Sequence, residues 1–112
     1  LASLADDGVL VIGSGHVTHN LRDWSLHRHE AASLDYVVQF SDWLHQRLVS
    51  GDRDAVLDYR ARAPSAARAH PTEEHFLPLF VAWGAAGIER PVTRAFSAVE
   101  GAALAMDAYL FG

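Results

Sequence analysis

Two short segments of the chain carry the residues that could do chemistry, and histidine dominates both. The first segment places His16 and His19 three residues apart, directly after the glycine-rich turn Gly13–Gly15. Neutral histidine binds divalent transition metals and acts as a general base near neutral pH, and glycine lets a backbone approach a ligand closely. The pattern is not a dinucleotide-binding fingerprint, because Thr18 stands where the third glycine belongs. A plain turn with two solvated histidines is the alternative interpretation.

The second segment combines two histidines with two carboxylates beside an apolar stretch. His70, Glu73, Glu74 and His75 lie within six residues. Electrostatic interactions strengthen at the rim of a water-excluding wall, which favours metal binding and proton transfer there. The alternative is structural: both glutamates would be ordinary charges in the first turn of a helix, and His75 would be a half-buried side chain with its polar atoms satisfied.

The composition limits what these histidines could serve. The 112 residues contain no cysteine, so a metal would need nitrogen and oxygen ligands. Nine arginines, no lysine and fourteen carboxylates give a formal charge of −5, which argues against nucleic acid as a partner. The longest apolar stretch is far shorter than the roughly 20 residues of a membrane span. Since no signal peptide is visible either, a cytoplasmic location is predicted.

A strand is expected to position the first histidine pair. Val9–Ile12 is a run of four apolar residues, three of them β-branched, which predicts a fully buried strand of a parallel or mixed sheet. Residues 13–21 would then form a loop at its carboxyl end, where open α/β sheets bind ligands. A strand this apolar needs neighbours on both sides. We therefore expect an apolar face that a missing N-terminal half or another chain covers.

Helices are expected to occupy most of the middle of the chain. The apolar spacing of residues 31–49 predicts one long helix, largely covered, which ends at Ser50-Gly51. Asp52 can cap a second helix through about Arg62. Residues 22–30 show no clear period and are expected to form an irregular surface segment.

The next helix has two predicted starts. Thr72 can serve as its N-cap, but Pro78 cannot donate to residue 74, so the regular helix could instead begin near Pro78. In either case residues 79–86 are nearly all apolar and should be buried. The alternation in residues 102–111 favours a strand over a short helix.

Four stretches together resemble the C-terminal half of the class III extradiol ring-cleavage dioxygenases, the LigB-type superfamily, in its DOPA 4,5-dioxygenase-like branch. They are residues 8–15, 18–21, 70–79 and 104–112, and their order and spacing match as well. The most specific stretch is His70-Pro-Thr-Glu-Glu-His-Phe-Leu-Pro-Leu79. The resemblance implies an α/β fold of three layers, with helices flanking a mixed central sheet. It also implies that residues 1–112 are the C-terminal portion of a single catalytic domain.

The resemblance further implies the chemistry of the site. Similar enzymes open the ring of a catechol-type, DOPA-like substrate with O2, using non-haem Fe(II), which zinc can replace. By position, His75 matches the metal-binding histidine of this branch, and His19 matches the histidine that acts as acid and base. His16 is an additional histidine and joins His70 as a candidate accessory residue. The family's other metal-binding histidines lie in the N-terminal half, so this chain alone would hold an incomplete, inactive site.

Two other interpretations stay open. Members of the wider superfamily can keep the fold without the chemistry, which would make the protein a metal-binding or protein-interaction module. Alternatively, the chain is a plain α/β domain with incidental histidines. The dioxygenase hypothesis requires the rings of His19 and His75 to converge at one place in the fold.

Overall fold

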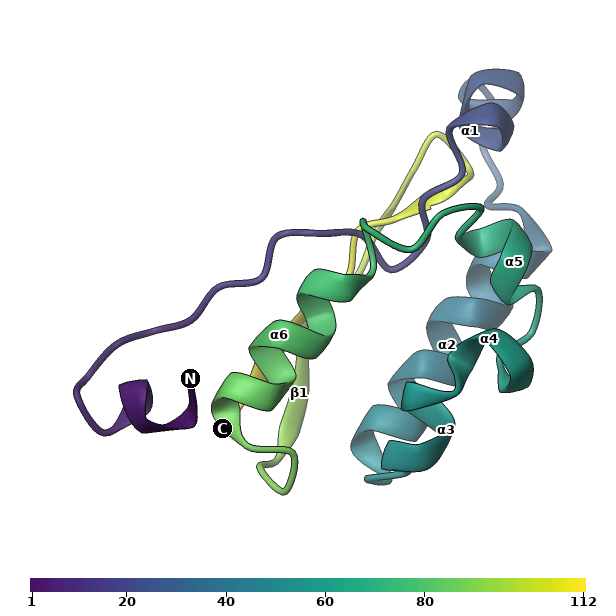
Figure 1. The fold of residues 1–112 in the computed structure, drawn as a ribbon. Coiled ribbons are helices and arrows are strands. Elements are labelled where there is room, and N and C mark those ends of the chain that lie inside the picture. The colour runs from purple at the N-terminus through teal and green to yellow at the C-terminus, as the bar shows by residue number, and fades with distance from the viewer.

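One long helix, α2 (Asp35–Val49), forms the largest element of the fold (Figure 1). The computed structural model describes residues 1–112 and is a mixture of helices and strands, as the predicted α/β class requires. Val37, Phe40, Leu44 and Leu48 follow one another at spacings of three and four, and all are buried. The helix predicted over residues 31–49 is therefore confirmed from Asp35 onward. Val38 of the same sequence stripe is 44% exposed, so the buried face is narrower than predicted.

Three short helices lie beside α2 in the order α3 (Arg53–Leu57), α4 (Tyr59–Arg62) and α5 (Ala66–Ala69) (Figure 1). The Asp52 side chain accepts a hydrogen bond from the Ala55 amide at 3.2 Å, which confirms the predicted cap. The helix predicted to continue to Arg62 is interrupted, because Asp58 leaves the helical region with φ −97° and ψ 31°. The chain changes direction at this interruption, and α4 and α5 then lead to the segment that carries His70 and His75.

Helix α6 (Leu77–Ala86) takes the later of the two predicted starts. Pro78 falls in its first turn, where a missing N–H costs no intrahelical hydrogen bond. Trp83 and Ala85 are buried, but Val81 is 49% exposed, so the prediction that the whole helix is buried was too broad. No helix of the chain is both long and apolar enough to span a membrane. The cytoplasmic location stays a prediction.

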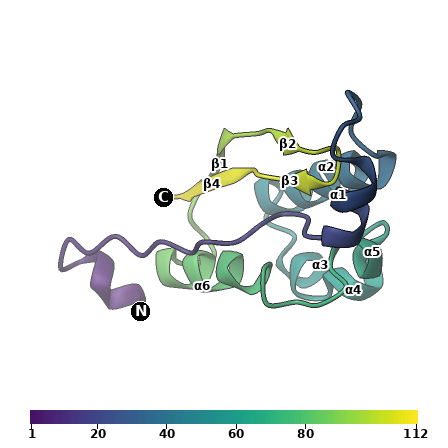
Figure 2. The same ribbon diagram turned by 90° about the horizontal axis from the view of Figure 1, so that it is seen from above.

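An irregular hairpin closes the fold above the helices (Figure 2). Strand β1 (Val92–Phe96) pairs antiparallel with β4 (Ala108–Phe111), and β2 (Val99–Glu100) pairs antiparallel with β3 (Leu104–Ala105). The hairpin contacts α2 through β1 and β3, and it contacts α6 through β4. The strand predicted within residues 102–111 is confirmed in two pieces, β3 and β4. Strand β1 was not predicted.

The strand predicted at Val9–Ile12 is not formed within this chain. After the short 3-10 helix η1 (Ala2–Ala5), residues 9–15 run extended past α6 without a strand partner (Figure 2). Leu10 and Ile12 are each 79% exposed, so the predicted burial is wrong for the chain by itself. The physical reason is that a strand needs a neighbouring edge, and a groove separates this segment from β4.

The segment predicted to be irregular contains a helix, α1 (Leu21–His27). The Asn20 side chain accepts a hydrogen bond from the Asp23 amide at 3.0 Å and so caps the first turn. Apolar periodicity did not reveal α1, because polar contacts hold it: Arg68 pairs with the buried Asp23 carboxylate at 2.8 Å.

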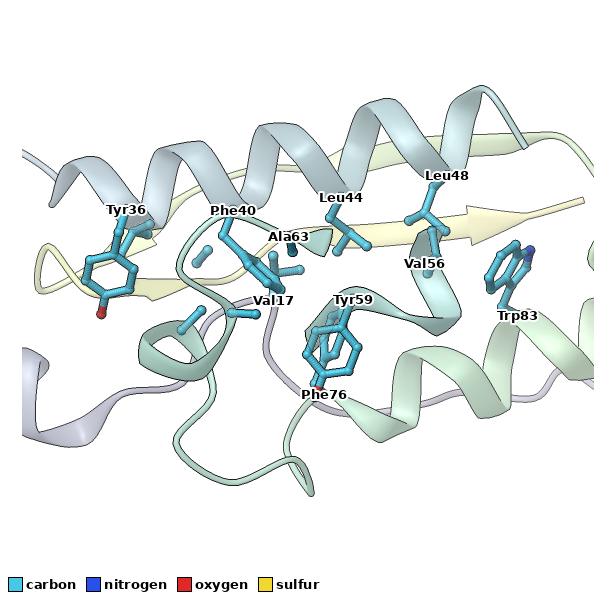
Figure 3. Close-up of a cluster of buried hydrophobic side chains, with 14 residues drawn as sticks. Val17, Tyr36, Phe40, Leu44, Leu48, Val56, Tyr59, Ala63, Phe76 and Trp83 are labelled. Carbon is cyan, nitrogen blue, oxygen red and sulfur yellow. The ribbon is translucent and has the colours of Figure 1, made fainter. Parts of the chain in front are cut away.

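Aromatic side chains fill the core between α2, α4 and α6 (Figure 3). Phe40, Tyr59 and Phe76 meet with ring centroids 4.7–6.3 Å apart. His70 lies among them and is fully buried, with its ring stacked on Phe76 at 4.6 Å. Burial, which disfavours the charged imidazole, lowers the pKa of His70 from 6.5 to about 4. His70 is therefore a neutral core residue at physiological pH.

The burial of His70 predicts how stability changes in acid. Between the pKa of the unfolded state and the lower pKa of the fold, only the unfolded chain takes up a proton on His70. The free energy of unfolding should therefore fall as pH drops through this window, by roughly 3 kcal/mol in total. Urea unfolding of the wild type and of His70→Gln at about pH 7 and about pH 4 measures the difference. Equal losses of stability in the two proteins would contradict it.

Candidate metal centre

Three imidazole rings converge at one place in the fold. The rings of His19 and His75 are stacked with their centroids 3.6 Å apart, and His16 lies 5.0 Å from His19 and 6.3 Å from His75. One ring nitrogen from each residue can be chosen so that all three lie within 4.8 Å of one another. The convergence of His19 and His75 that the dioxygenase hypothesis requires is therefore present, and His16 joins them.

Backbone hydrogen bonds hold the two segments that carry these rings together. We call them loop 16–20 and segment 69–76. The His16 amide donates to the His75 carbonyl, and the His19 amide donates to the Ala69 carbonyl, both at 2.8 Å. The Asn20 side chain adds a third link, because its amide donates to the Arg68 carbonyl at 2.8 Å. Segments about 50 residues apart in sequence are thus fixed against each other.

The hairpin supports loop 16–20 from its other side. The Val17 amide donates to the Ala105 carbonyl at 3.1 Å. The fully buried Thr18 hydroxyl donates to the Ala103 carbonyl and accepts from the Ala105 amide, each at 2.8 Å. Loop 16–20 is therefore held on both sides, so its histidines project from a fixed backbone.

Glycine is required where the chain passes α6. A Cβ atom at Gly15 would overlap the His75 carbonyl, and one at Gly13 would overlap the Pro78 carbonyl. Both obstacles are backbone atoms that cannot swing away. The glycine-rich turn therefore allows a close approach of two backbones, and this approach places His16 next to His75.

The surroundings favour neutral imidazole at His19. Partial burial lowers the pKa of His19, and a positive charge on His75 or His16 would lower it further. The Glu74 carboxylate acts in the opposite direction, and it lies 3.7 Å from the His75 ring nitrogen. A neutral imidazole can accept a proton or bind a metal, whereas a charged one can do neither.

The other two candidate residues of the second segment lie outside the cluster. Glu73 accepts a hydrogen bond from the Tyr59 hydroxyl at 3.2 Å and lies 3.4 Å from Arg60, so it joins the segment to α4. His70 lies in the aromatic core described above. The structure thus gathers His16, His19 and His75 and places His70 behind them.

The donor set fits a divalent transition metal. Three ring nitrogens can approach a common point, and imidazole suits iron and zinc better than magnesium or calcium. Each histidine offers one ring nitrogen, Nδ1 or Nε2, to such a site, and the buried Nδ1 atom of His16 has no hydrogen-bond partner in the protein. This chain supplies no thiolate to the cluster.

A groove of about 790 Å³ borders the cluster and was not predicted as a site. Residues 9–17, α6 and β4 line it, and 17 of its 25 lining residues are hydrophobic. His16 and His75 stand at its wall. The apolar run at Val9–Ile12 predicted an uncovered apolar face, but the other walls come from distant parts of the chain, so the groove as a whole had no local sequence signal.

The chain belongs to the LigB family. The family model described as the catalytic LigB subunit of aromatic ring-opening dioxygenase matches residues 1–103. The predicted resemblance to this family is confirmed.

Proteins named 4,5-DOPA dioxygenase extradiol are similar to the chain over most of its length. The protein of Beta vulgaris is 36% identical over 111 residues, which cover 99% of this chain and 41% of the relative. The protein of Portulaca grandiflora is 41% identical over 88 residues, covering 78% of this chain and 32% of the relative. The Escherichia coli K12 protein is 28% identical over 109 residues, covering 95% and 40%. The chain thus spans between 32% and 41% of the length of these three relatives.

A solved structure has the same fold as this chain. The crystal structure of an uncharacterized protein from Escherichia coli K12 matches with a TM-score of 0.85 at 25% sequence identity. The match covers all of this chain and 46% of that protein.

The glycine contacts predict that Gly15→Ala separates the two histidine segments. The added methyl group meets the His75 carbonyl, so the variant should lose about 1–3 kcal/mol of stability and bind Zn²⁺ more weakly than the wild type. Gly84→Ala is the control, because nothing lies within 4 Å of the new methyl group and alanine favours the helix by about 0.5–1 kcal/mol. Urea unfolding and zinc titration measure both effects. Wild-type zinc affinity in Gly15→Ala would overturn this account.

Proposed function

We propose that the protein is a metal-dependent extradiol dioxygenase that opens the ring of a catechol-type, DOPA-like substrate with O2. The observation that carries this proposal is the stacking of His19 on His75 beside His16 in a member of the LigB family. Both oxygen atoms enter the product as the carbon–carbon bond next to the diol breaks, so no external reductant is required. Residues 1–112 would form the C-terminal portion of the catalytic domain, since the chain spans 41% or less of the named relatives.

The proposal divides the work between two imidazoles. His75 would hold Fe(II), or zinc in its place, together with ligands from outside these residues. The metal supplies Lewis acidity toward the diol and a site for O2. His19 would take a proton from the substrate hydroxyl and later return one. Its neutral form, favoured by burial, suits a base near physiological pH.

His16 gives the cluster a third imidazole. One of its ring nitrogens would accept a hydrogen bond from a substrate hydroxyl or complete the coordination of the metal. Both roles place it as an accessory to His19 and His75. His70 is fully buried in the core and therefore has no direct access to a metal or a substrate.

Substitution of each histidine separates the proposed roles. In the full-length protein, His75→Ala should lose bound iron, whereas His19→Ala should keep it and lower turnover about 100- to 10,000-fold. The exposed His29 provides the control His29→Ala, which should change neither. Metal analysis and O2 consumption with a catechol measure the two effects. Equal metal loss in the two cluster variants would refute the division of roles. Bound metal without O2 consumption in the wild type would favour a metal-binding module.

We also propose that a β-strand from the part of the full-length protein outside these residues covers the apolar groove. No amide from residue 10 to residue 15 donates to another backbone group, so this segment offers an unpaired strand edge. Leu10 and Ile12 expose apolar surface beside it. The greater length of the relatives supports an occupant from the same polypeptide over a second copy or a different protein.

Truncation of Leu10 tests whether the groove is covered. In the full-length protein, Leu10→Ala should lower the free energy of unfolding by about 2–5 kcal/mol if a strand packs on this side chain. The control Leu26→Ala, at a residue 68% exposed on α1, should stay within about 0.5 kcal/mol of the wild type. Urea unfolding measures both. A Leu10→Ala effect as small as the control would show that no strand lies there.

A further inference from the structure

His70 lies near the start of segment 69–76 and contacts both loop 16–20 and the end of its own segment. Its Nε2 atom hydrogen-bonds the Val17 carbonyl at 2.7 Å, across 53 residues of sequence. Val17 lies between His16 and His19 in loop 16–20. The ring of His70 stacks on Phe76, the residue that follows His75. One buried side chain thus lies between the backbone of one histidine segment and the aromatic anchor of the other.

The chemistry of this contact fixes the state of the ring. A carbonyl oxygen only accepts hydrogen bonds, so the proton of the neutral imidazole is on Nε2 and Nε2–H is the donor. Nδ1 then carries a lone pair, and it is buried without a partner. Phe40 at 5.5 Å and Tyr59 at 6.2 Å pack edge-on against the ring and restrict its rotation.

A histidine is a costly choice for this position. An unpaired buried polar atom costs on the order of 1–3 kcal/mol, and a phenylalanine would pack among the same aromatic rings without that penalty. The one interaction that phenylalanine could not make is the hydrogen bond to Val17. The hydrogen bond to Val17 is therefore the interaction that histidine contributes at this position and phenylalanine would not.

We propose that His70 is a positioning residue. Its hydrogen bond to the Val17 carbonyl holds loop 16–20 in the position, relative to segment 69–76, in which the ring of His19 stacks on the ring of His75. The backbone links of His16 to His75 and of His19 to Ala69 join the segments at their two ends, and His70 supports the loop between those links. The inference rests on the proposed function only where it concerns the bound metal. The stacking of the two rings can be observed without metal, substrate or turnover.

Two substitutions distinguish the effect of the hydrogen-bond donor of His70 from the effect of packing its ring in the core. His70→Gln keeps an N–H donor near the position of Nε2 but has no ring, whereas His70→Phe keeps the ring and has no donor. Val56→Ala is the matched control, because Val56 is fully buried in the same core but lies toward Leu48, away from Val17 and Phe76 (Figure 3). It destabilises the core without touching the hydrogen bond.

The measurements are the nuclear Overhauser effect between the ring protons of His19 and His75, and the dissociation constant for Co²⁺, both in the full-length folded protein. His70→Gln and Val56→Ala should keep the ring contact and the wild-type affinity. His70→Phe should lose the ring contact and bind Co²⁺ about 10- to 100-fold more weakly, as expected for loss of a group that orients a metal ligand.

The outcomes are decisive in each direction. Retention of the ring contact and of the Co²⁺ affinity in His70→Phe overturns the proposal. Loss of both in Val56→Ala also overturns it, because any loosening of the core would then be sufficient to separate the two rings. If His70→Phe does not fold, His70→Gln decides alone: loss of the ring contact in that variant overturns the proposal, and retention supports it. A wild type that shows the ring contact but consumes no O2 with catechols would refute the dioxygenase and leave the role of His70 intact.

Discussion

The candidate site depends on the close approach of two backbones that are far apart in sequence. The His16 amide reaches the His75 carbonyl, and the His19 amide reaches the Ala69 carbonyl. The first of these bonds requires glycine at position 15, because a Cβ atom there would occupy the space of the His75 carbonyl. Ring stacking, the shared ring-nitrogen geometry and the depressed pKa of His19 all follow from this approach. The helices and the hairpin serve mainly to hold the two segments in place.

The aromatic core also sets the electrostatic character of the cluster. Phe40, Tyr59 and Phe76 exclude water behind the histidines, so the charged form of a nearby imidazole is disfavoured. His70 shows the full effect at the centre of this core, and His19 shows a weaker form at its edge. Burial within the fold therefore favours the neutral form of both His70 and His19.

Local patterns in the sequence predicted the elements whose partners lie nearby. The spacing of Val37, Phe40 and Leu44 identified α2, and Asp52 identified the cap of α3. The family motifs predicted that His19 and His75 meet, whereas the presence of His16 in the cluster was left open. Long-range contacts explain the failures. Helix α1 depends on a salt bridge to Arg68, β1 depends on its pairing with β4, and the burial of His70 depends on a carbonyl 53 residues away. The strand prediction at residues 9–12 failed for a related reason, since no strand of the chain pairs with this segment.

The buried hydroxyl of Thr18 has a consequence for which sequences this fold can accept. The hydroxyl donates a hydrogen bond to the carbonyl of Ala103, just before β3, and accepts one from the amide of Ala105 in β3, so a single oxygen satisfies two main-chain groups of the hairpin. Valine has nearly the same shape as threonine and would fill the same volume, yet it would leave a carbonyl and an amide without partners in a dry interior. Serine would preserve both bonds and lose only a methyl group. At this position hydrogen-bonding capacity limits the choice of side chain more tightly than size does, the reverse of what holds at the buried aliphatic positions around it.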